Sequence, residues 1–214
     1  VEVVLFNLPA GDWDKGERGI ACHASRVSDF RNGVASALAY AAESGCRRLN
    51  MISGIIETRT RNAELSARQT FISNLRFAAR ELERAGVMLV IEPINTRTVP
   101  GMFVRNSAQA LALIDEADIA NARLQYDVFH MQIMEGDLAS TIAANIARIG
   151  HIQIGDVPDR HEPGTGEINF PWLFDHIDRT GYDGWIGAEY EPAGATLDGL
   201  GWVRPWLDAA QGTA

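Results

Sequence analysis

Short apolar runs of strand length alternate with segments of helical periodicity along nearly the whole chain. Between the runs, apolar side chains recur at three- and four-residue spacing, as on the buried stripe of a helix. This alternation is typical of a parallel sheet covered by helices. Six runs rich in β-branched or other apolar residues predict strands, at residues 3–8, 48–52, 87–94, 123–129, 151–155 and 185–190.

The helical segments carry recognisable end signals. Gly45 and Gly86 stand where the first two helices would end in a residue of positive φ. Ser107 and Asp137 are candidate N-caps, and Pro205 is expected to kink the last helix or to end its regular part. The helices are predicted from the apolar stripe at residues 27–41 and at residues 65–85, 107–116, 137–149, 170–179 and 196–209.

Parallel strands joined by right-handed crossovers form either an open doubly wound sheet or a closed barrel. A nucleotide-binding open sheet usually carries a glycine-rich phosphate loop after its first strand, and none follows residues 3–8. Four predicted strands instead end with a polar residue in apolar surroundings, as barrel enzymes do. These residues are Glu92, Asp127, Gln153 and Glu189. We therefore expect residues 1–214 to form a single α/β domain of the (β/α)8 TIM-barrel class.

A closed barrel needs eight strands, and the pattern predicts six. The chain starts at Val1, without Met, directly before an apolar run. We expect that the first two βα units, roughly 40 to 60 residues, are absent from this chain, or else that two sheet edges stay open.

Composition narrows the choice of partners. The chain is 46% apolar and 22% charged, with a net charge of −9, which would repel nucleic acid. It holds two cysteines and no apolar run of membrane-spanning length. We expect a cytoplasmic protein that binds a small molecule and neither nucleic acid nor a membrane; a homo-oligomer is compatible with the sequence.

The four strand-end residues supply three carboxylates and one amide. Hard divalent cations such as Mg²⁺ or Mn²⁺ prefer these oxygen ligands, so the group predicts one metal ion and no organic cofactor. The alternative is that each carboxylate makes a local salt bridge or caps a helix. Around a bound metal and substrate, Glu92 and Glu189 would lie on opposite sides, where one takes a proton and the other gives one.

The flanking sequence resembles a known family along nearly the whole chain. The matching segments are residues 6–13 (FNLPAGDW), 16–21 (GERGIA), 91–95 (IEPIN), 125–130 (QYDVFH), 151–154 (HIQI) and 161–169 (HEPGTGEIN). They look like the hydroxypyruvate isomerase family of xylose-isomerase-like barrels. The resemblance implies an eight-stranded barrel, of which this chain holds strands three to eight. It makes Glu92, Asp127, Gln153 and Glu189 the metal ligands, with Glu92 and Glu189 as the acid/base pair.

The same resemblance implies that His130 and Arg160 contact substrate oxygens. The alternatives are a structural hydrogen bond for His130 and a surface salt bridge to Glu162 for Arg160. Asn7 either orients substrate or bonds a neighbouring loop. Gln153 stands where ketose 3-epimerases of the superfamily commonly have His, which favours the isomerase branch.

The resemblance, together with the proposed acid/base pair, implies an isomerase that interconverts hydroxypyruvate and 2-hydroxy-3-oxopropanoate (tartronate semialdehyde) through an enediolate. The same chemistry on a larger oxo-acid such as 2-oxo-tetronate, or a ketose 3-epimerase, stays open. Metal-dependent cleavage of damaged DNA uses a related barrel, but it needs a His-rich site and a basic surface. A sugar-acid binding protein without turnover is the non-enzymatic alternative.

Overall fold

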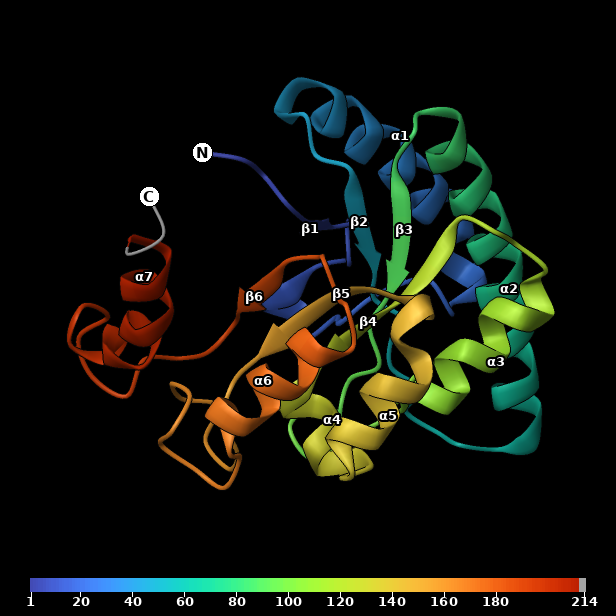
Figure 1. The fold of residues 1–214 in the computed structure, drawn as a ribbon. Helices are drawn as coiled ribbons and strands as arrows, with labels where there is room; N and C mark the ends of the chain where they lie inside the picture. The colour runs from blue at the N-terminus through green and yellow to red at the C-terminus, as the bar shows by residue number, and fades with distance from the viewer. Residues whose placement is uncertain (212–214) are drawn as a thin grey trace.

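The computed structural model describes residues 1–211, except for the side chains from residue 209 onward (Figure 1). One sheet of six parallel strands forms the centre of the molecule, and its spatial order is the chain order, β1-β2-β3-β4-β5-β6. The strands are β1 (Phe6–Asn7), β2 (Arg48–Met51), β3 (Met88–Ile91), β4 (Ala122–Asp127), β5 (Ile149–Ile154) and β6 (Ile186–Ala188).

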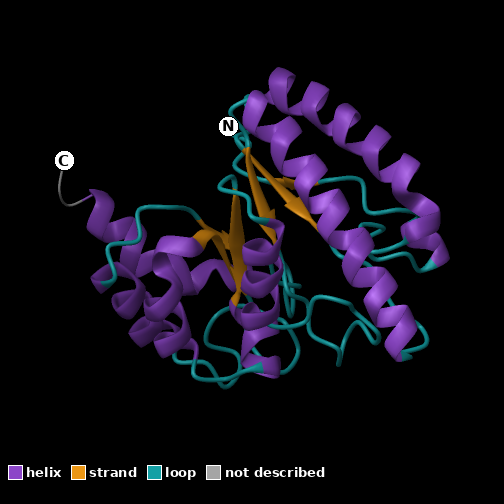
Figure 2. Cartoon of the chain, turned by 90° about the vertical axis from the view of Figure 1, so that its right-hand side faces the viewer, coloured by secondary structure: helices purple, strands orange, loops and turns teal. Residues whose placement is uncertain are grey.

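This order distinguishes between the two sheet types that the sequence allowed. A doubly wound sheet reverses its strand order at a switch point, whereas a barrel adds each strand beside the one before. The sheet here never reverses and curls into a partial barrel with helices on its outer side (Figure 2). The TIM-barrel class is therefore confirmed. Among residues 1–211, β1 has β2 as its only strand neighbour and β6 has β5.

Seven α-helices and four short 3₁₀ turns connect or follow the strands in the described part of the chain. The α-helices are α1 (Val27–Ser44), α2 (Arg61–Arg84), α3 (Ser107–Ala117), α4 (Val128–Met134), α5 (Leu138–Asn145), α6 (Phe170–Arg179) and α7 (Arg204–Gln211). The 3₁₀ turns are Trp13–Lys15, Ala24–Arg26, Ile146–Arg148 and Asp198–Val203. Helices α1, α2 and α3 pack in sequence, and α5 packs on α6.

Most element predictions are confirmed, with corrections at their ends. The strand predicted at residues 123–129 stops at Asp127, because the carboxylate of Asp127 caps a helix that starts at once. The N-cap of α3 is Asn106, not Ser107, since the Asn106 side chain accepts the N–H of Gln109. Pro205 lies in the first turn of α7, where its missing N–H costs no hydrogen bond, and not at a kink.

Alternating side chains divide the sheet into two faces. Leu49, Leu89 and Ile91 are fully buried in the main core under the helices. Their neighbour Asn50 lies on the opposite, inner face, where it bonds Glu92. The outer layer follows the same rule, because α2 turns Phe71, Leu75 and other apolar side chains onto the sheet. Each such buried side chain contributes about 1.5–3 kcal/mol of transfer free energy.

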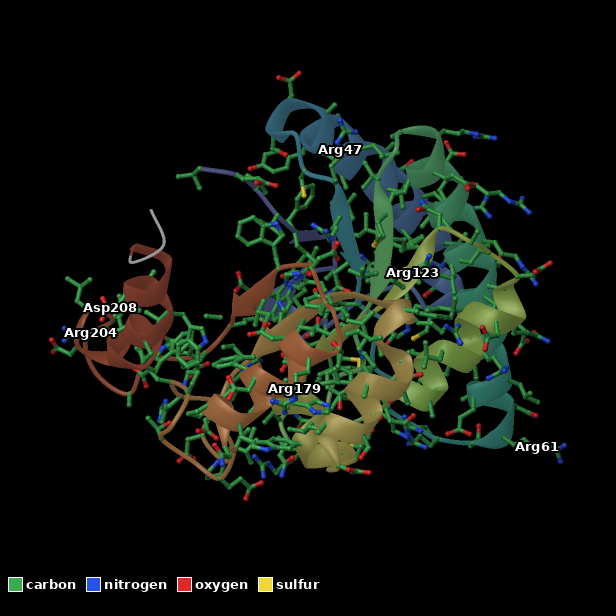
Figure 3. The ribbon with its side chains drawn as sticks, in the orientation of Figure 1. Arg47, Arg61, Arg123, Arg179, Arg204 and Asp208 are labelled. Atoms are coloured by element: carbon green, nitrogen blue, oxygen red, sulfur yellow. The ribbon has the colours of Figure 1, made fainter. Side chains whose placement is uncertain are left out.

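Charged side chains lie mostly at the periphery. Arg61 and Arg179 are exposed at the ends of α2 and α6, and Arg47 is exposed in the connection between α1 and β2 (Figure 3). Within the described residues, none of the helices combines the length and the apolar character that a membrane span needs. The polar groups of the inner face are therefore the unusual ones, and they define the candidate site.

Candidate functional site

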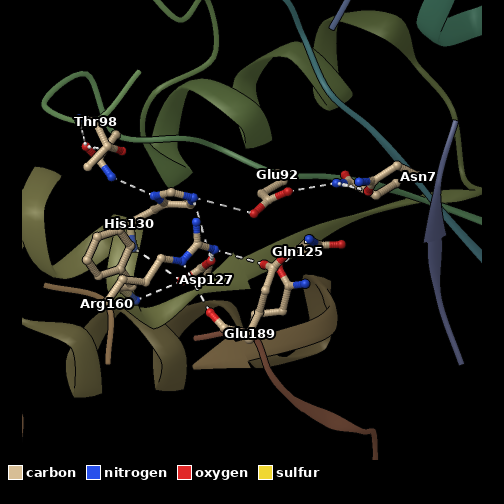
Figure 4. Close-up of polar contacts among 12 residues, drawn as sticks. Asn7, Glu92, Thr98, Gln125, Asp127, His130, Arg160 and Glu189 are labelled. Atoms are coloured by element: carbon tan, nitrogen blue, oxygen red, sulfur yellow. Dashed lines mark hydrogen bonds and ion pairs between the residues drawn. The ribbon is translucent and has the colours of Figure 1, made fainter. Parts of the chain in front are cut away.

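Four polar side chains lie at the C-terminal ends of neighbouring strands. Glu92 directly follows β3, Asp127 ends β4, Gln153 is the last residue but one of β5, and Glu189 directly follows β6. Asp127 pairs in register with Gln153, and Gln153 with Gly187, two residues before Glu189. Because side chains two residues apart share a face, the strands carry these groups to one rim of the inner face, where Figure 4 shows Glu92, Asp127 and Glu189.

Glu92, Asp127 and His130 form the buried part of this site, each at most 5% exposed. Nε2 of His130 lies 3.8 Å from Oε1 of Glu92 and 3.7 Å from Oδ2 of Asp127. The two oxygens of Asp127 have separate tasks. Oδ1 accepts the N–H groups of Phe129 and His130 and so starts α4, whereas Oδ2 faces the site.

Arg160 joins Asp127 to Glu189. Its Nη2 lies 3.0 Å from Oδ2 of Asp127 and 2.9 Å from Oε2 of Glu189. The guanidinium also lies 5.0 Å from the ring centre of Phe129, a distance at which the ring face attracts a cation. The salt bridge to Glu162 considered from the sequence is not formed, since Glu162 accepts the N–H of Ala193 instead. Arg160 therefore belongs to the site.

The two glutamates hold their protons more tightly than free carboxyls do. Burial raises the pKa of Glu92 well above its usual value, and the charges of Asp127 and Glu189 raise it further. Arg160 and the hydrogen bond from Asn50 oppose this rise. Burial also raises the pKa of Glu189, against the effect of Arg160. Carboxyl groups with raised pKa values are candidates for proton exchange with a substrate.

Amide side chains on the inner face orient the predicted ligands. Nε2 of Gln125 donates to Oε1 of Gln153 and so fixes the carbonyl oxygen of that side chain. Nδ2 of Asn50 donates to Oε2 of Glu92 at 2.7 Å and to Oδ1 of Asn7 at 3.0 Å. Asn7 thus bonds a side chain of the adjacent strand β2. Gln125 and Asn50 were missed in the sequence, although each is a lone amide in an apolar strand.

The loop that carries Arg160 is organised by Asp156, another residue that the sequence did not single out. Its carboxylate accepts the N–H groups of four residues, Val157, Gly164, Gly166 and Ile168. A Cβ on Gly166 would lie 1.9 Å from the carbonyl oxygen of Val157, so this position requires glycine. The PGTG segment at residues 163–166, which supported the resemblance, thus surrounds the carboxylate of Asp156. Asp156 lies two residues beyond the end of β5, and this position was the signal in the sequence that could have identified it.

The donor chemistry of the site fits a hard divalent cation. Glu92, Asp127 and Glu189 bring three carboxylates to one rim, and the first two lie with His130 in a group whose ligand atoms are all within 4.8 Å of one another. The carbonyl oxygen of Gln153 lies on the adjacent strand. Burial is the main cause of the raised pKa of Glu92, and the charges of Asp127 and Glu189 add a repulsion that a cation would relieve. The ligand set of Glu92, Asp127, Gln153 and Glu189 stays a prediction.

Residues 1–206 match the family described as "Xylose isomerase-like TIM barrel". The chain is 46% identical to 2-oxo-tetronate isomerase of Cupriavidus necator, over 95% of this chain and 77% of that protein. It is 45% identical to hydroxypyruvate isomerase of Escherichia coli, over 96% of this chain and 79% of that protein. A crystal structure described as AP endonuclease, family 2, from Brucella melitensis superimposes with a TM-score of 0.92 at 43% identity, covering 96% of this chain and 79% of that one.

Proposed function

Because the chain belongs to the xylose isomerase-like TIM-barrel family, we propose that it is an isomerase of small oxo-acids that interconverts hydroxypyruvate and 2-hydroxy-3-oxopropanoate. The similar proteins named hydroxypyruvate isomerase and 2-oxo-tetronate isomerase support the reaction class. The observation that carries the proposal is the meeting of Glu92, Asp127 and Glu189 with Arg160 and His130 at one rim of the sheet.

The two glutamates are the proposed proton carriers. One carboxylate removes a proton from C3 of hydroxypyruvate, and the electron pair forms the C2–C3 double bond of an enediolate. The other carboxyl delivers a proton to C2, while the hydroxyl proton at O3 passes to O2. Burial raises the pKa of both carboxyls, which makes each a better proton acceptor than a free carboxylate and supports this exchange.

Glu92, Asp127, Gln153 and Glu189 are the proposed ligands of one Mg²⁺ or Mn²⁺ ion. Such an ion supplies Lewis-acid polarisation of the carbonyl and hydroxyl oxygens of the substrate. Asp127 is suited to holding a cation because its Oδ1 is occupied by backbone N–H groups while Oδ2 faces the site. Gln153 is held in place by Gln125.

Arg160 is the proposed group for the substrate carboxylate, which a guanidinium binds with two parallel hydrogen bonds. Its Nη2 already spans two carboxylates of the site, so a substrate carboxylate would compete with Asp127 or Glu189 for it. His130 faces the same space and would donate to a substrate oxygen. Asn7 bonds Asn50, which in turn bonds Glu92, so a positioning role for Asn7 is supported beside the predicted substrate contact.

The first test is a turnover assay on hydroxypyruvate with Mg²⁺, Mn²⁺ or chelator. We expect Glu92→Gln and Glu189→Gln each to lower kcat by at least about 10²-fold, with metal binding partly retained. Solvent deuterium should enter the product at carbon in the wild type and not in the variants. The exposed Glu43→Gln is the matched control and should leave turnover unchanged. Full activity in either site variant, or turnover unaffected by chelator, contradicts the proposal.

The same assay separates the substrates that remain open. 2-Oxo-tetronate and a ketose panel are run beside hydroxypyruvate, and the highest kcat/KM identifies the substrate. A higher value for a ketose would favour the 3-epimerase alternative. An abasic-site oligonucleotide is included because one similar structure is described as an AP endonuclease. We expect no cleavage, because a chain of net charge −9 repels phosphate backbones.

A further inference from the structure

Asn95 is a fully buried side chain next to the site that the proposed reaction does not yet use. It lies four residues beyond the end of β3. Its Oδ1 accepts the backbone N–H of Arg97 at 3.0 Å, the backbone N–H of Thr98 at 2.8 Å and the hydroxyl of Thr98. A backbone N–H can only donate, so these bonds establish which atom of the amide is oxygen. The opposite atom, Nδ2, is therefore a donor by necessity.

Nδ2 of Asn95 lies 2.7 Å from Nδ1 of His130. Since Nδ2 carries only hydrogens to offer, Nδ1 must accept with its lone pair and cannot carry a proton. The imidazole is then neutral, with its single proton on Nε2.

The Nε2 proton is directed into the site. The carboxylate oxygens of Glu92 and Asp127 that face it lie at 3.8 and 3.7 Å, beyond hydrogen-bond length. The N–H is thus aimed between the two carboxylates, where the reacting oxygens of a substrate would lie. With a proton on Nε2 and Nδ1 bonded to Asn95, neither ring nitrogen has a lone pair for a metal ion, although a nitrogen of His130 lies within 4.8 Å of an oxygen of each carboxylate.

We propose that Asn95 is a positioning residue that locks His130 as a neutral Nε2–H donor, so that the ring gives a hydrogen bond to the substrate oxygen on which negative charge develops and stays outside the metal's ligand set. This inference rests on the proposed function, because it assigns the lock a role in that reaction. A preorganised donor at a developing oxyanion typically accounts for about 10²–10³-fold in kcat.

Asn95→Asp tests the lock with the least change of shape. The carboxylate still accepts the N–H groups of Arg97 and Thr98, so the turn is kept, but it offers Nδ1 an acceptor in place of a donor. We expect the proton of His130 to move to Nδ1. Histidine-selective ¹⁵N NMR of the metal-free protein reports the protonation of each ring nitrogen, and the His130 signals are identified by their absence in His130→Gln.

Kinetics are then compared on hydroxypyruvate at a pH where the NMR shows a single ring proton on His130 in both proteins. We expect Asn95→Asp to lower kcat by about 10²-fold with KM changed only a few-fold, since the lost bond strengthens in the transition state. Thr98→Val is the matched control. It removes the hydroxyl bond to Oδ1 but leaves the donor to Nδ1, and it should retain both the tautomer and the activity.

The outcomes distinguish this inference from the proposed function. A wild type with its proton on Nδ1, or an Asn95→Asp variant with the wild-type tautomer or wild-type kcat, overturns the lock. A wild type that carries the proton on Nε2, loses it in Asn95→Asp and yet isomerises none of the substrates overturns the catalytic role and the proposed function together, while leaving the hydrogen-bond assignment intact.

Discussion

Four backbone N–H groups converge on the carboxylate of Asp156, and the loop that they close presents Arg160 to the site. Hydrogen bonds to a charged acceptor contribute about 1.5–3 kcal/mol each when the acceptor is buried, more than neutral ones do. The position of Arg160 therefore depends on a residue that need not touch substrate.

Asp156→Asn should loosen this loop, because the introduced amide NH₂ would face backbone N–H groups that need an acceptor. We expect a loss of about 2–3 kcal/mol in the free energy of unfolding and a higher KM for hydroxypyruvate. Urea unfolding and steady-state kinetics measure the two effects. Asp159→Asn, an exposed change in the same loop, is the control. Equal stability of the two variants would mean that the carboxylate does not hold the loop.

At the residue scale, the sequence pointed to the candidate ligands and substrate contacts but not to most of the amide side chains that orient them. Glu92 and Asp127 stand out because a carboxylate is unusual at the end of an otherwise apolar strand. Asn50, Asn95 and Gln125 do not stand out, because a neutral amide is tolerated wherever one or two hydrogen bonds are available. Their roles depend on which atoms face each other across strands far apart in sequence.

At the element scale, apolar periodicity predicted all six strands and most helices, because burial of one face decides those elements. The ends were less predictable, since they depend on capping bonds. Residue 170 begins and residue 179 ends α6 as expected, whereas α4 was missed. Its apolar residues Val128 and Phe129 continue the pattern of β4, and the change to helix is made by the Asp127 side chain.

Asn106→Ala tests the N-cap of α3, which is Asn106 and not the predicted Ser107. Oδ1 of Asn106 accepts the N–H of Gln109 at 2.8 Å, and alanine leaves that group without its partner. We expect the free energy of unfolding to fall by about 1 kcal/mol, measured by urea titration. Ser36→Ala, an exposed change inside α1, should not destabilise. No loss in Asn106→Ala would show that another group caps α3.

At the scale of the whole molecule, the inner face of the sheet makes stability depend on pH. Burial, assisted by the charge of Arg48, lowers the pKa of His151 from 6.5 to about 4. The unfolded chain therefore takes up this proton at a higher pH than the folded protein does. The contribution of His151 to stability is fully present above the unfolded pKa of 6.5 and is lost as the pH falls towards 4.

Wild type should thus lose about 2–3 kcal/mol from this group between about pH 7 and pH 4.5. His151→Asn should flatten that part of the stability profile, as measured by urea unfolding across the range. Ser36→Ala, an exposed change that removes no titrating group, is the comparison and should keep the wild-type slope. A wild-type slope in His151→Asn would mean that His151 is not the group that titrates.

The strict order of the sheet has a consequence for how the site is assembled. Glu92, Asp127, Gln153 and Glu189 come from four consecutive strands, and each of those strands pairs only with its chain neighbours within residues 1–211. The site therefore spans three strand–strand interfaces, or seams: β3 to β4, β4 to β5 and β5 to β6. The strands on one side of any seam do not carry the complete set of four side chains. A cation bound by all four side chains would clamp these seams together, so that ligand binding and the docking of successive units become a single thermodynamic event.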